Sequence, residues 1–113
     1  MACDEIGIDM SDVIDWAHLE RQTMGEVEIA RDVLQLFVQH LDEALQYMAI
    51  EDVELAARVH KLKGSARGVG AWNVAKIADR FVQPQADVTA DLEDLKFAMQ
   101  VAKGAALNKL RSF

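Results

Sequence analysis

His60 has the surroundings most suggestive of chemistry among the three histidines of the sequence. Small residues and cations flank it at helical spacings: Ala56, Ala57, Lys63, Gly64 and Arg67. Positions three, four and seven apart lie on one face of a helix, so these residues would border the imidazole. Neutral imidazole is a nucleophile, and cationic side chains donate charge-assisted hydrogen bonds to phosphate. The pattern therefore indicates an accessible nucleophile beside groups that could neutralise a bound anion or steer an acidic partner.

Gly64 is the unusual member of this group, because glycine within a helix costs about 1 kcal/mol relative to alanine. Close approach of another molecule would compensate for that cost. Together with Ala56 and Ala57, Gly64 leaves little bulk on the turns next to His60. We therefore expect this surface to be a docking site.

A helix with a buried stripe must position His60. Its apolar residues follow a 4-3-4-3 spacing: Leu55, Val59, Leu62, Ala66 and Val69. This spacing is typical of helices packed in a bundle. At about 100° per residue, His60 points about 140° away from the centre of that stripe. We therefore expect the imidazole to be exposed to water, with Arg58 and Lys61 directed elsewhere.

The remaining sequence predicts an all-α chain. Apolar residues recur at spacings of three and four almost throughout, and Pro84 is the only proline. Five helices are expected: from Ser11 or Asp12 to Met24, 27–48, from Glu51 or Asp52 to 69, 73–82, and from Asp87 or Thr89 through Leu110. Four long helices joined by short turns predict an antiparallel four-helix bundle with a short additional N-terminal helix. We expect residues 1–113 to form a single domain.

The composition narrows the class of protein. The net charge of −7 over 113 residues argues against a broad nucleic-acid surface, because phosphate binding needs clustered Lys and Arg. Cys3 is the only cysteine, so no internal disulfide or cysteine-based metal site can form, which suits a reducing compartment. The first ten residues do not resemble a secretory signal, and no apolar stretch approaches the ~18 residues of a membrane span. We expect a cytoplasmic monomer that binds neither nucleic acid nor membrane.

Other chemistry fits the sequence less well. The glycine-rich segment 64–70 lacks the Gly-Lys-Ser/Thr of a phosphate-binding loop, and Asn73 stands where a dinucleotide fingerprint needs its third glycine. The three histidines lack the four-residue spacing that helical metal sites favour. We therefore expect no bound metal and no autonomous ATP chemistry, with His40 making one hydrogen bond at the core boundary. The tryptophans and methionines are interpreted mainly as core residues.

The segment around His60 resembles the histidine-containing phosphotransfer family. The phosphohistidine helix of that family carries His-x-Leu-Lys-Gly-Ser followed closely by Gly-Ala, and residues 60–71 read His-Lys-Leu-Lys-Gly-Ser-Ala-Arg-Gly-Val-Gly-Ala. The early Ile14-Asp15, Phe37 and the later helices follow the family's order, so the resemblance covers most of the chain. Ala66 stands where the family often has a small hydroxyl side chain. Because Ala66 lies on the inward stripe, this departure concerns packing.

The resemblance implies a phosphoryl carrier that binds the receiver domains of a hybrid sensor kinase and of a response regulator. It assigns His60 as the phosphoacceptor through Nε2, Lys63 as the phosphate-side cation and Gly64 as the clearance for the receiver. It implies no cofactor bound by this chain, with magnesium supplied by the receiver. Ser65 matches the motif, but its expected direction, about 80° from the stripe centre and away from His60, indicates a polar or capping role. An apolar docking patch is also implied. Its candidates, for each of which core packing or helix cover is the equal alternative, are Ile14, Leu19, Met24 and Val53.

Two other function classes stay open. A phosphotransfer domain of the chemotaxis-kinase type would be phosphorylated directly by a histidine kinase, whereas an adaptor bundle would carry no phosphate chemistry. The chain begins at Met1 and ends soon after the last expected helix without an attached kinase module, which favours a free-standing carrier. Because no general base stands beside His60, we expect a phosphoryl carrier without kinase activity of its own.

Overall fold

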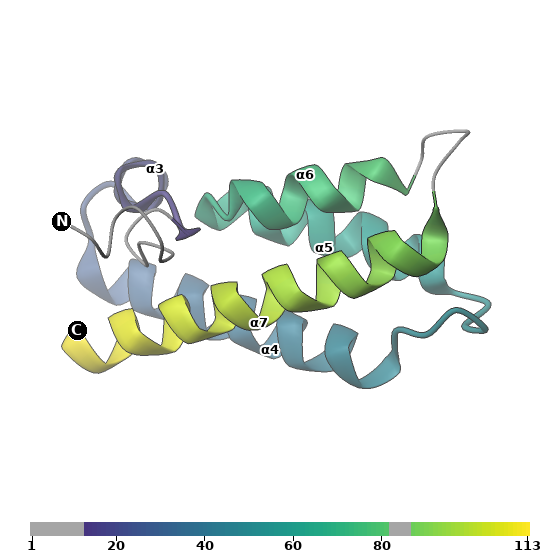
Figure 1. The fold of residues 1–113 in the computed structure, drawn as a ribbon. Helices are drawn as coiled ribbons and strands as arrows, with labels where there is room; N and C mark the ends of the chain where they lie inside the picture. The colour runs from purple at the N-terminus through teal and green to yellow at the C-terminus, as the bar shows by residue number, and fades with distance from the viewer. Residues whose placement is uncertain (1–12, 82–86) are drawn as a thin grey trace, which may run out of the picture.

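The fold is described from a computed structural model, which describes residues 13–81 and 87–113. In this part of the chain five helices follow one another: α3 (Trp16–Gln22), α4 (Val27–Tyr47), α5 (Leu55–Val69), α6 (Trp72–Arg80) and α7 (Val88–Ser112). The four from α4 to α7 alternate in direction, and α3 lies at the end of the bundle where α4 begins and α7 ends (Figure 1). The predicted antiparallel four-helix bundle with a short additional N-terminal helix is confirmed.

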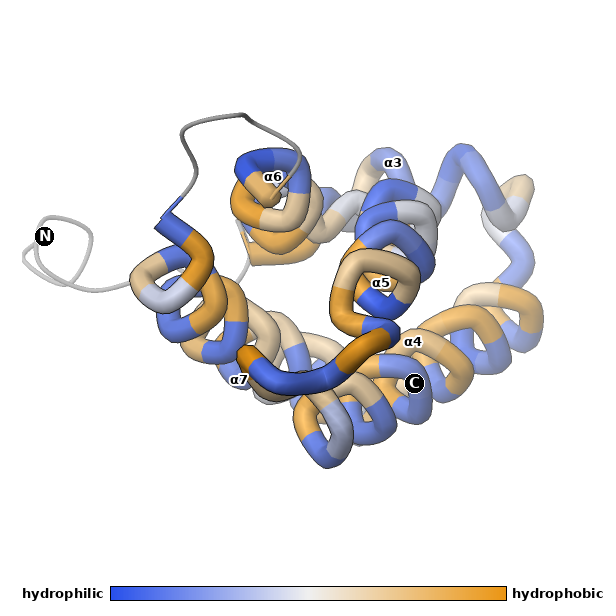
Figure 2. Tube along the Cα trace, turned by 90° about the vertical axis from the view of Figure 1, so that its right-hand side faces the viewer, coloured by the Kyte–Doolittle hydropathy of each residue, from blue (hydrophilic) through white to orange (hydrophobic). Residues whose placement is uncertain are grey.

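The core forms where each long helix turns an apolar stripe inward. All five stripe residues predicted for α5 are buried, from Leu55 to Val69. Figure 2 looks along the bundle and shows hydrophobic residues of α5 and α6 turned toward its interior. Burying a Leu or Val side chain contributes about 1.5–3 kcal/mol, which exceeds differences in helix propensity. The stripe therefore fixes the rotation of α5 about its own axis.

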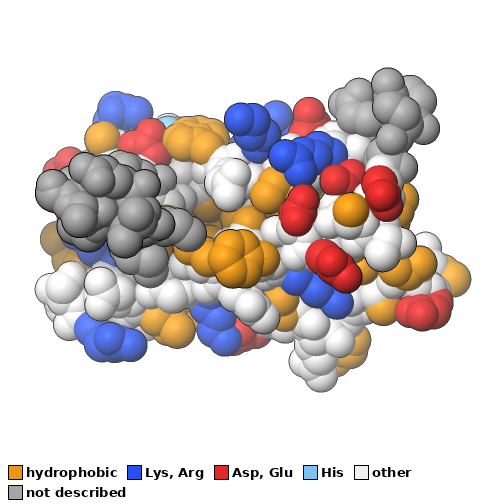
Figure 3. Space-filling view, in the orientation of Figure 1, with side chains coloured by type: hydrophobic (Ala, Val, Ile, Leu, Met, Phe, Trp, Pro, Cys, Tyr) orange, Lys and Arg blue, Asp and Glu red, His pale blue; other side chains and the backbone are white. Residues whose placement is uncertain are grey.

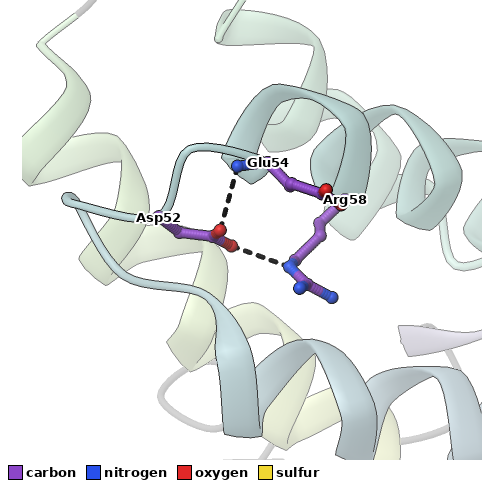
Figure 4. A network of polar contacts seen from close by, with 3 residues as sticks. All are labelled: Asp52, Glu54 and Arg58. Carbon is purple, nitrogen blue, oxygen red and sulfur yellow. Dashed lines mark hydrogen bonds and ion pairs between the residues drawn. The ribbon is translucent and has the colours of Figure 1, made fainter.

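The N-terminus of α5 is held by an acidic side chain that precedes it. Asp52 Oδ1 accepts a 2.9 Å hydrogen bond from the backbone N–H of Glu54, and Oδ2 accepts a 2.7 Å bond from Nε of Arg58 (Figure 4). These two interactions lower the pKa of the Asp52 carboxyl, the backbone bond being the larger cause. The helix begins at Leu55, later than predicted, because Asp52 binds the first turn from outside the helix.

α3 is capped by Asp15, and the predicted caps Ser11 and Asp12 lie outside the described residues. Asp15 Oδ1 accepts a hydrogen bond of 3.0 Å from the backbone N–H of His18, and Oδ2 accepts another of 3.0 Å from Nε1 of Trp72. The indole bond is the largest cause of a lowered pKa at Asp15. One carboxylate thus begins α3 and joins it to the first residue of α6.

The other helix ends lie close to their predicted positions. α4 ends one residue before Met48, and α6 runs from Trp72 to Arg80, whereas the predicted end at Val82 lies outside the described residues. Of the two caps proposed for α7, Asp87 is confirmed because its Oδ1 accepts a 3.2 Å hydrogen bond from Ala90 N–H. These ends set the short turns that keep neighbouring helices antiparallel.

The turn between α5 and α6 depends on Gly70. Its φ of +83° is a left-handed conformation, and its carbonyl accepts a 2.9 Å hydrogen bond from Asp15 N–H. A Cβ at position 70 would stand 2.8 Å from the Cβ of Asp15. Glycine is therefore required both by the backbone conformation and by the close approach of the segment that leads into α3.

We predict that Gly70→Ala lowers the free energy of unfolding by about 2 kcal/mol or more, because it adds left-handed strain to a steric clash. The matched control is Gly64→Ala, since Gly64 lies within α5 with open space beside it. The control should leave stability unchanged or raise it by up to about 1 kcal/mol. Urea unfolding of both variants measures the difference, and equal stabilities would contradict the account of Gly70.

Candidate functional site

The outer face of α5 presents His60 to solvent. The side chain is exposed, as its position opposite the buried stripe predicts, and so are Ala56 and Ala57 on the preceding turn. Apart from the local helix backbone, no atom lies within 4 Å of where a Cβ on Gly64 would stand, and the same holds for Gly68. A partner that approaches His60 therefore meets methyl groups on one side and bare helix backbone on the other.

The two cations expected beside His60 have different environments. Arg67 is exposed, whereas Lys63 is partly buried and its Nζ donates a 2.6 Å hydrogen bond to Oδ1 of Asp79 on α6. The hydrogen bond and charge of Lys63 lower the pKa of Asp79, and the charge of Arg67 lowers it further. Lys63 thus lies one helical turn from His60 but is paired with a carboxylate on the neighbouring helix.

Arg58 and Lys61 point away from the imidazole, as predicted. Besides its bond to Asp52, Arg58 places its guanidinium 5.2 Å from the ring centroid of Tyr47 at the end of α4. Lys61 borders a small hollow between α4 and α5. Neither side chain belongs to the group around His60.

Ser65 has a structural contact outside that group. Its Oγ lies 2.7 Å from Nδ1 of His40, so that one hydrogen bond joins α5 to α4. The predicted polar role of Ser65 is confirmed, and so is the single hydrogen bond expected of a boundary histidine at position 40.

The four candidates for an apolar docking patch divide into two pairs. Ile14 and Leu19 are 0% and 3% exposed, so the expectation that they contact a partner is wrong. Both side chains belong to the core, because a helix as short as α3 stays attached to the bundle through its apolar residues. Met24 and Val53 are 81% and 96% exposed, and their use in docking stays a prediction.

His60 is exposed on α5 and lines neither of two hollows that lie among the described residues. One hollow, of about 200 Å³, lies beside α3 and is lined by Trp16, Lys109 and Phe113 among others. The other, of about 50 Å³, lies at the surface between α4 and α5. Both are smaller than the roughly 300–1,000 Å³ typical of small-molecule sites. Within residues 13–81 and 87–113, no three His, Cys, Asp or Glu side chains cluster so as to hold a metal ion. The geometry suits a macromolecular partner that contacts an exposed nucleophile.

Comparison with protein-family models matches residues 30–111 to the Hpt domain. This range holds more than half of the chain, including all of α5. The chain belongs to the Hpt domain family. Hpt domains serve histidine phosphotransfer in phosphorelays, as phosphocarrier modules that interact with receiver and kinase domains of two-component systems. Comparisons with curated proteins and with solved structures give no match.

α3 precedes the matched residues but contacts the helix that carries His60. The matched range begins at Ala30, so α3 and its contacts with α5 lie outside the match. These contacts nevertheless reach the helix of His60, because Nε2 of His18 lies 3.0 Å from the carbonyl oxygen of Arg67. A carbonyl only accepts, so Nε2 of His18 carries the proton. The N-terminal helix thus supports the end of α5 that follows the site.

The surface of the Hpt domain mixes both signs of charge. On the face drawn in Figure 3, basic and acidic side chains alternate, without a continuous basic stripe. Arg80, for example, lies 3.8 Å from Asp91 and 3.5 Å from Asp94. Among the described residues, no helix combines the length and apolar character needed to cross a membrane.

Sequence reasoning missed three residues that support the site: Asp15, Trp72 and Asp79. The apolar character of Trp72 predicts a core residue, but Trp72 is 45% exposed and its indole N–H donates a hydrogen bond to Asp15. Asp79 left a signal in the sequence, because Lys63 precedes Ala71 by eight residues and Asp79 follows it by eight. Residues equally distant from a tight turn lie side by side in antiparallel helices. Using that register would have paired Lys63 with Asp79.

We predict that Ser65→Ala lowers the free energy of unfolding by about 1 kcal/mol, because His40 loses its bond to α5. Ser112→Ala is the matched control, since its hydroxyl binds only Lys109 O in the last turn of α7. Urea unfolding measures both changes. Phosphorylation of the Ser65→Ala variant should equal that of the unmutated Hpt domain, and a large loss would give Ser65 a part in transfer.

Proposed function

We propose that this Hpt domain carries a phosphoryl group on His60 between the aspartates of two receiver domains, one in a hybrid sensor kinase and one in a response regulator. The observation that supports this most directly is an exposed imidazole on a helix face cleared by Ala56, Ala57 and Gly64. A receiver active site can then approach the imidazole without meeting a bulky neighbour on the adjacent turns. We further propose that the carrier acts as a monomer in the cytoplasm.

The first transfer uses Nε2 of neutral His60 as the nucleophile. Its lone pair attacks the phosphorus of the receiver's aspartyl phosphate, so an N–P bond forms while the acyl O–P bond breaks. The electron pair of the broken bond stays on the receiver carboxylate, and the ring then loses its Nδ1 proton to water. In the second transfer the ring regains that proton and the carboxylate of the next receiver attacks phosphorus. The N–P bond breaks and its electron pair returns to Nε2.

The partner supplies most of the transition-state stabilisation in this proposal. The exposed face offers a nucleophile with Arg67 and Lys63 nearby, and magnesium is bound by the receiver. Positioning the two reactants is the main contribution of the docked complex. Because His60 is the nucleophile in the first transfer and the leaving group in the second, the carrier needs no kinase chemistry of its own.

Gly64 and the exposed apolar residues near α5 would determine how the receiver docks. Gly64 allows the partner backbone to approach the turn that follows His60. Val53 stands just before α5, seven residues ahead of His60, and is available for apolar contact. Met24 is also exposed, at the corner between α3 and α4. Because α4 runs the length of the bundle between them, Met24 and Val53 lie at opposite ends (Figure 1), and we propose each as a separate apolar contact for the receiver.

We predict that His60→Gln abolishes phosphoryl acceptance while leaving the helical fold intact, because the side chain is exposed. The Hpt domain is mixed with a phosphorylated receiver, and intact mass at alkaline pH counts acid-labile phosphoryl groups. His40→Gln is the control, since His40 bonds to Ser65 and not to the site. The unmutated chain and the control should each gain one group, whereas His60→Gln should gain none.

Other outcomes of that experiment separate the competing functions. Full acceptance by His60→Gln would reject the site. Acceptance only from a histidine kinase with ATP would favour direct phosphorylation, and no acceptance from any receiver or kinase would favour an adaptor.

We also predict that Gly64→Leu slows transfer from a receiver by about tenfold or more, because misplacement of reactants by even 1 Å is costly. Leucine improves helix propensity and its Cβ has open space, so the fold should persist. Phosphorylation by phosphoramidate, a small donor, is the internal control and should change little. If receiver transfer kept its full rate, Gly64 would not serve docking.

A further inference from the structure

Asp79 reaches from α6 to the edge of the face that carries His60. Its Oδ1 lies 2.6 Å from Lys63 Nζ, and the two side chains are 46% and 21% exposed respectively. The charge of Arg67 also acts on the Asp79 carboxylate. The carboxylate is therefore within electrostatic reach of both cations that flank His60.

The single ammonium of Lys63 cannot fully neutralise both the Asp79 carboxylate and a phosphoryl group on His60. Lys63 follows His60 by three residues, so the Cβ atoms of the two side chains are about 5–6 Å apart. Its ammonium has three donors on a flexible stem, and a small rotation redirects it from α6 toward the imidazole. A phosphoryl group on that ring carries more negative charge than a carboxylate. Because partly exposed ion pairs are weak, little free energy is lost when the Lys63 ammonium leaves Asp79 and binds the phosphoryl group.

We propose that Asp79 is a positioning residue that holds the Lys63 ammonium beside α6 and thereby weakens the affinity of His60 for the phosphoryl group. This inference rests on the proposed function of His60 as the phosphoacceptor. Before transfer, Lys63 neutralises Asp79. After transfer, the phosphoryl group and Asp79 compete for the same ammonium, so phosphorylated His60 is stabilised less than Lys63 alone would stabilise it.

This competition suits a carrier, which must give its phosphoryl group away. If the ammonium were free, it would stabilise phosphorylated His60 and would favour retention of the group. Asp79 keeps the free energies of phosphorylated and unphosphorylated His60 closer to each other, without contacting the reacting atoms. Removal of its charge should therefore raise the equilibrium constant for phosphorylation by about two- to fivefold, the range expected for a partly exposed pair.

The test needs no receiver. The Hpt domain is equilibrated with phosphoramidate and ammonia at fixed ratio; the phosphoryl group passes to Nε2 as the donor's N–P bond breaks and ammonia leaves. Intact mass gives the phosphorylated fraction for Asp79→Asn, for the conservative Asp79→Glu, for Lys63→Met, and for Asp79→Asn combined with Lys63→Met. Asp94→Asn is the matched control, because it removes the negative charge of a carboxylate on α7 that is paired with Arg80 of α6. Urea unfolding of each variant is measured in parallel.

The expected result is a larger phosphorylated fraction for Asp79→Asn only. Asp79→Glu should retain the equilibrium of the unmutated chain, and Asp79→Asn should have no effect when Lys63 is methionine. An effect of Asp79→Asn that equals that of Asp94→Asn, or that persists without Lys63, would overturn the role of Asp79 alone. If the unmutated chain and His60→Gln were phosphorylated equally, the proposed function would fail, and the role of Asp79 with it.

Discussion

Helix α5 must bury one side against three neighbours, and this constraint fixes the position of every side chain that could do chemistry here. α4, α6 and α3 all pack against it, and the five apolar residues between Leu55 and Val69 are buried as a result. At about 100° per residue, a rotation that exposed this stripe would carry His60 into the core. The free energy of apolar burial therefore also holds the nucleophile in water. No separate device is required to keep His60 exposed.

The two ends of α5 are held by polar contacts that the stripe cannot supply. Asp52 binds the first turn through Glu54 and Arg58, and Asp15 meets Gly70 just beyond the last turn. The carboxylate of Asp52 makes the first contact, whereas the backbone N–H of Asp15 donates to the carbonyl of Gly70. Hydrogen bonds to the Asp52 carboxylate favour its ionised form and lower its pKa. The polar contacts at its two ends thus fix the position of α5 along its axis, and burial of the apolar stripe fixes its rotation about that axis.

Features that depend on one helix could be predicted from the sequence, whereas contacts between different helices were missed. The stripe of α5, the exposure of His60 and the direction of Arg58 follow from spacing within one helix, so they could be read from nearby positions. The contacts of Lys63 with Asp79 and of Ser65 with His40 join residues on different helices. Such pairs depend on the register between helices, which local periodicity does not contain. The prediction that Ile14 and Leu19 contact a partner is wrong for a related reason. An apolar residue follows the same sequence pattern whether it packs in the core or contacts another protein.

Two glycines in α5, Gly64 and Gly68, have an effect on the molecule as a whole. A helix of about 15 residues is marginal in water even with favourable composition, and each interior glycine weakens it by about 1 kcal/mol. A peptide with the sequence of α5 would therefore be largely unstructured, although it contains His60, Lys63, Gly64 and Ser65. Small single domains unfold cooperatively, so the helical presentation of His60 is lost together with the bundle. Conditions that unfold part of the population therefore remove the exposed, helix-borne imidazole in the same proportion.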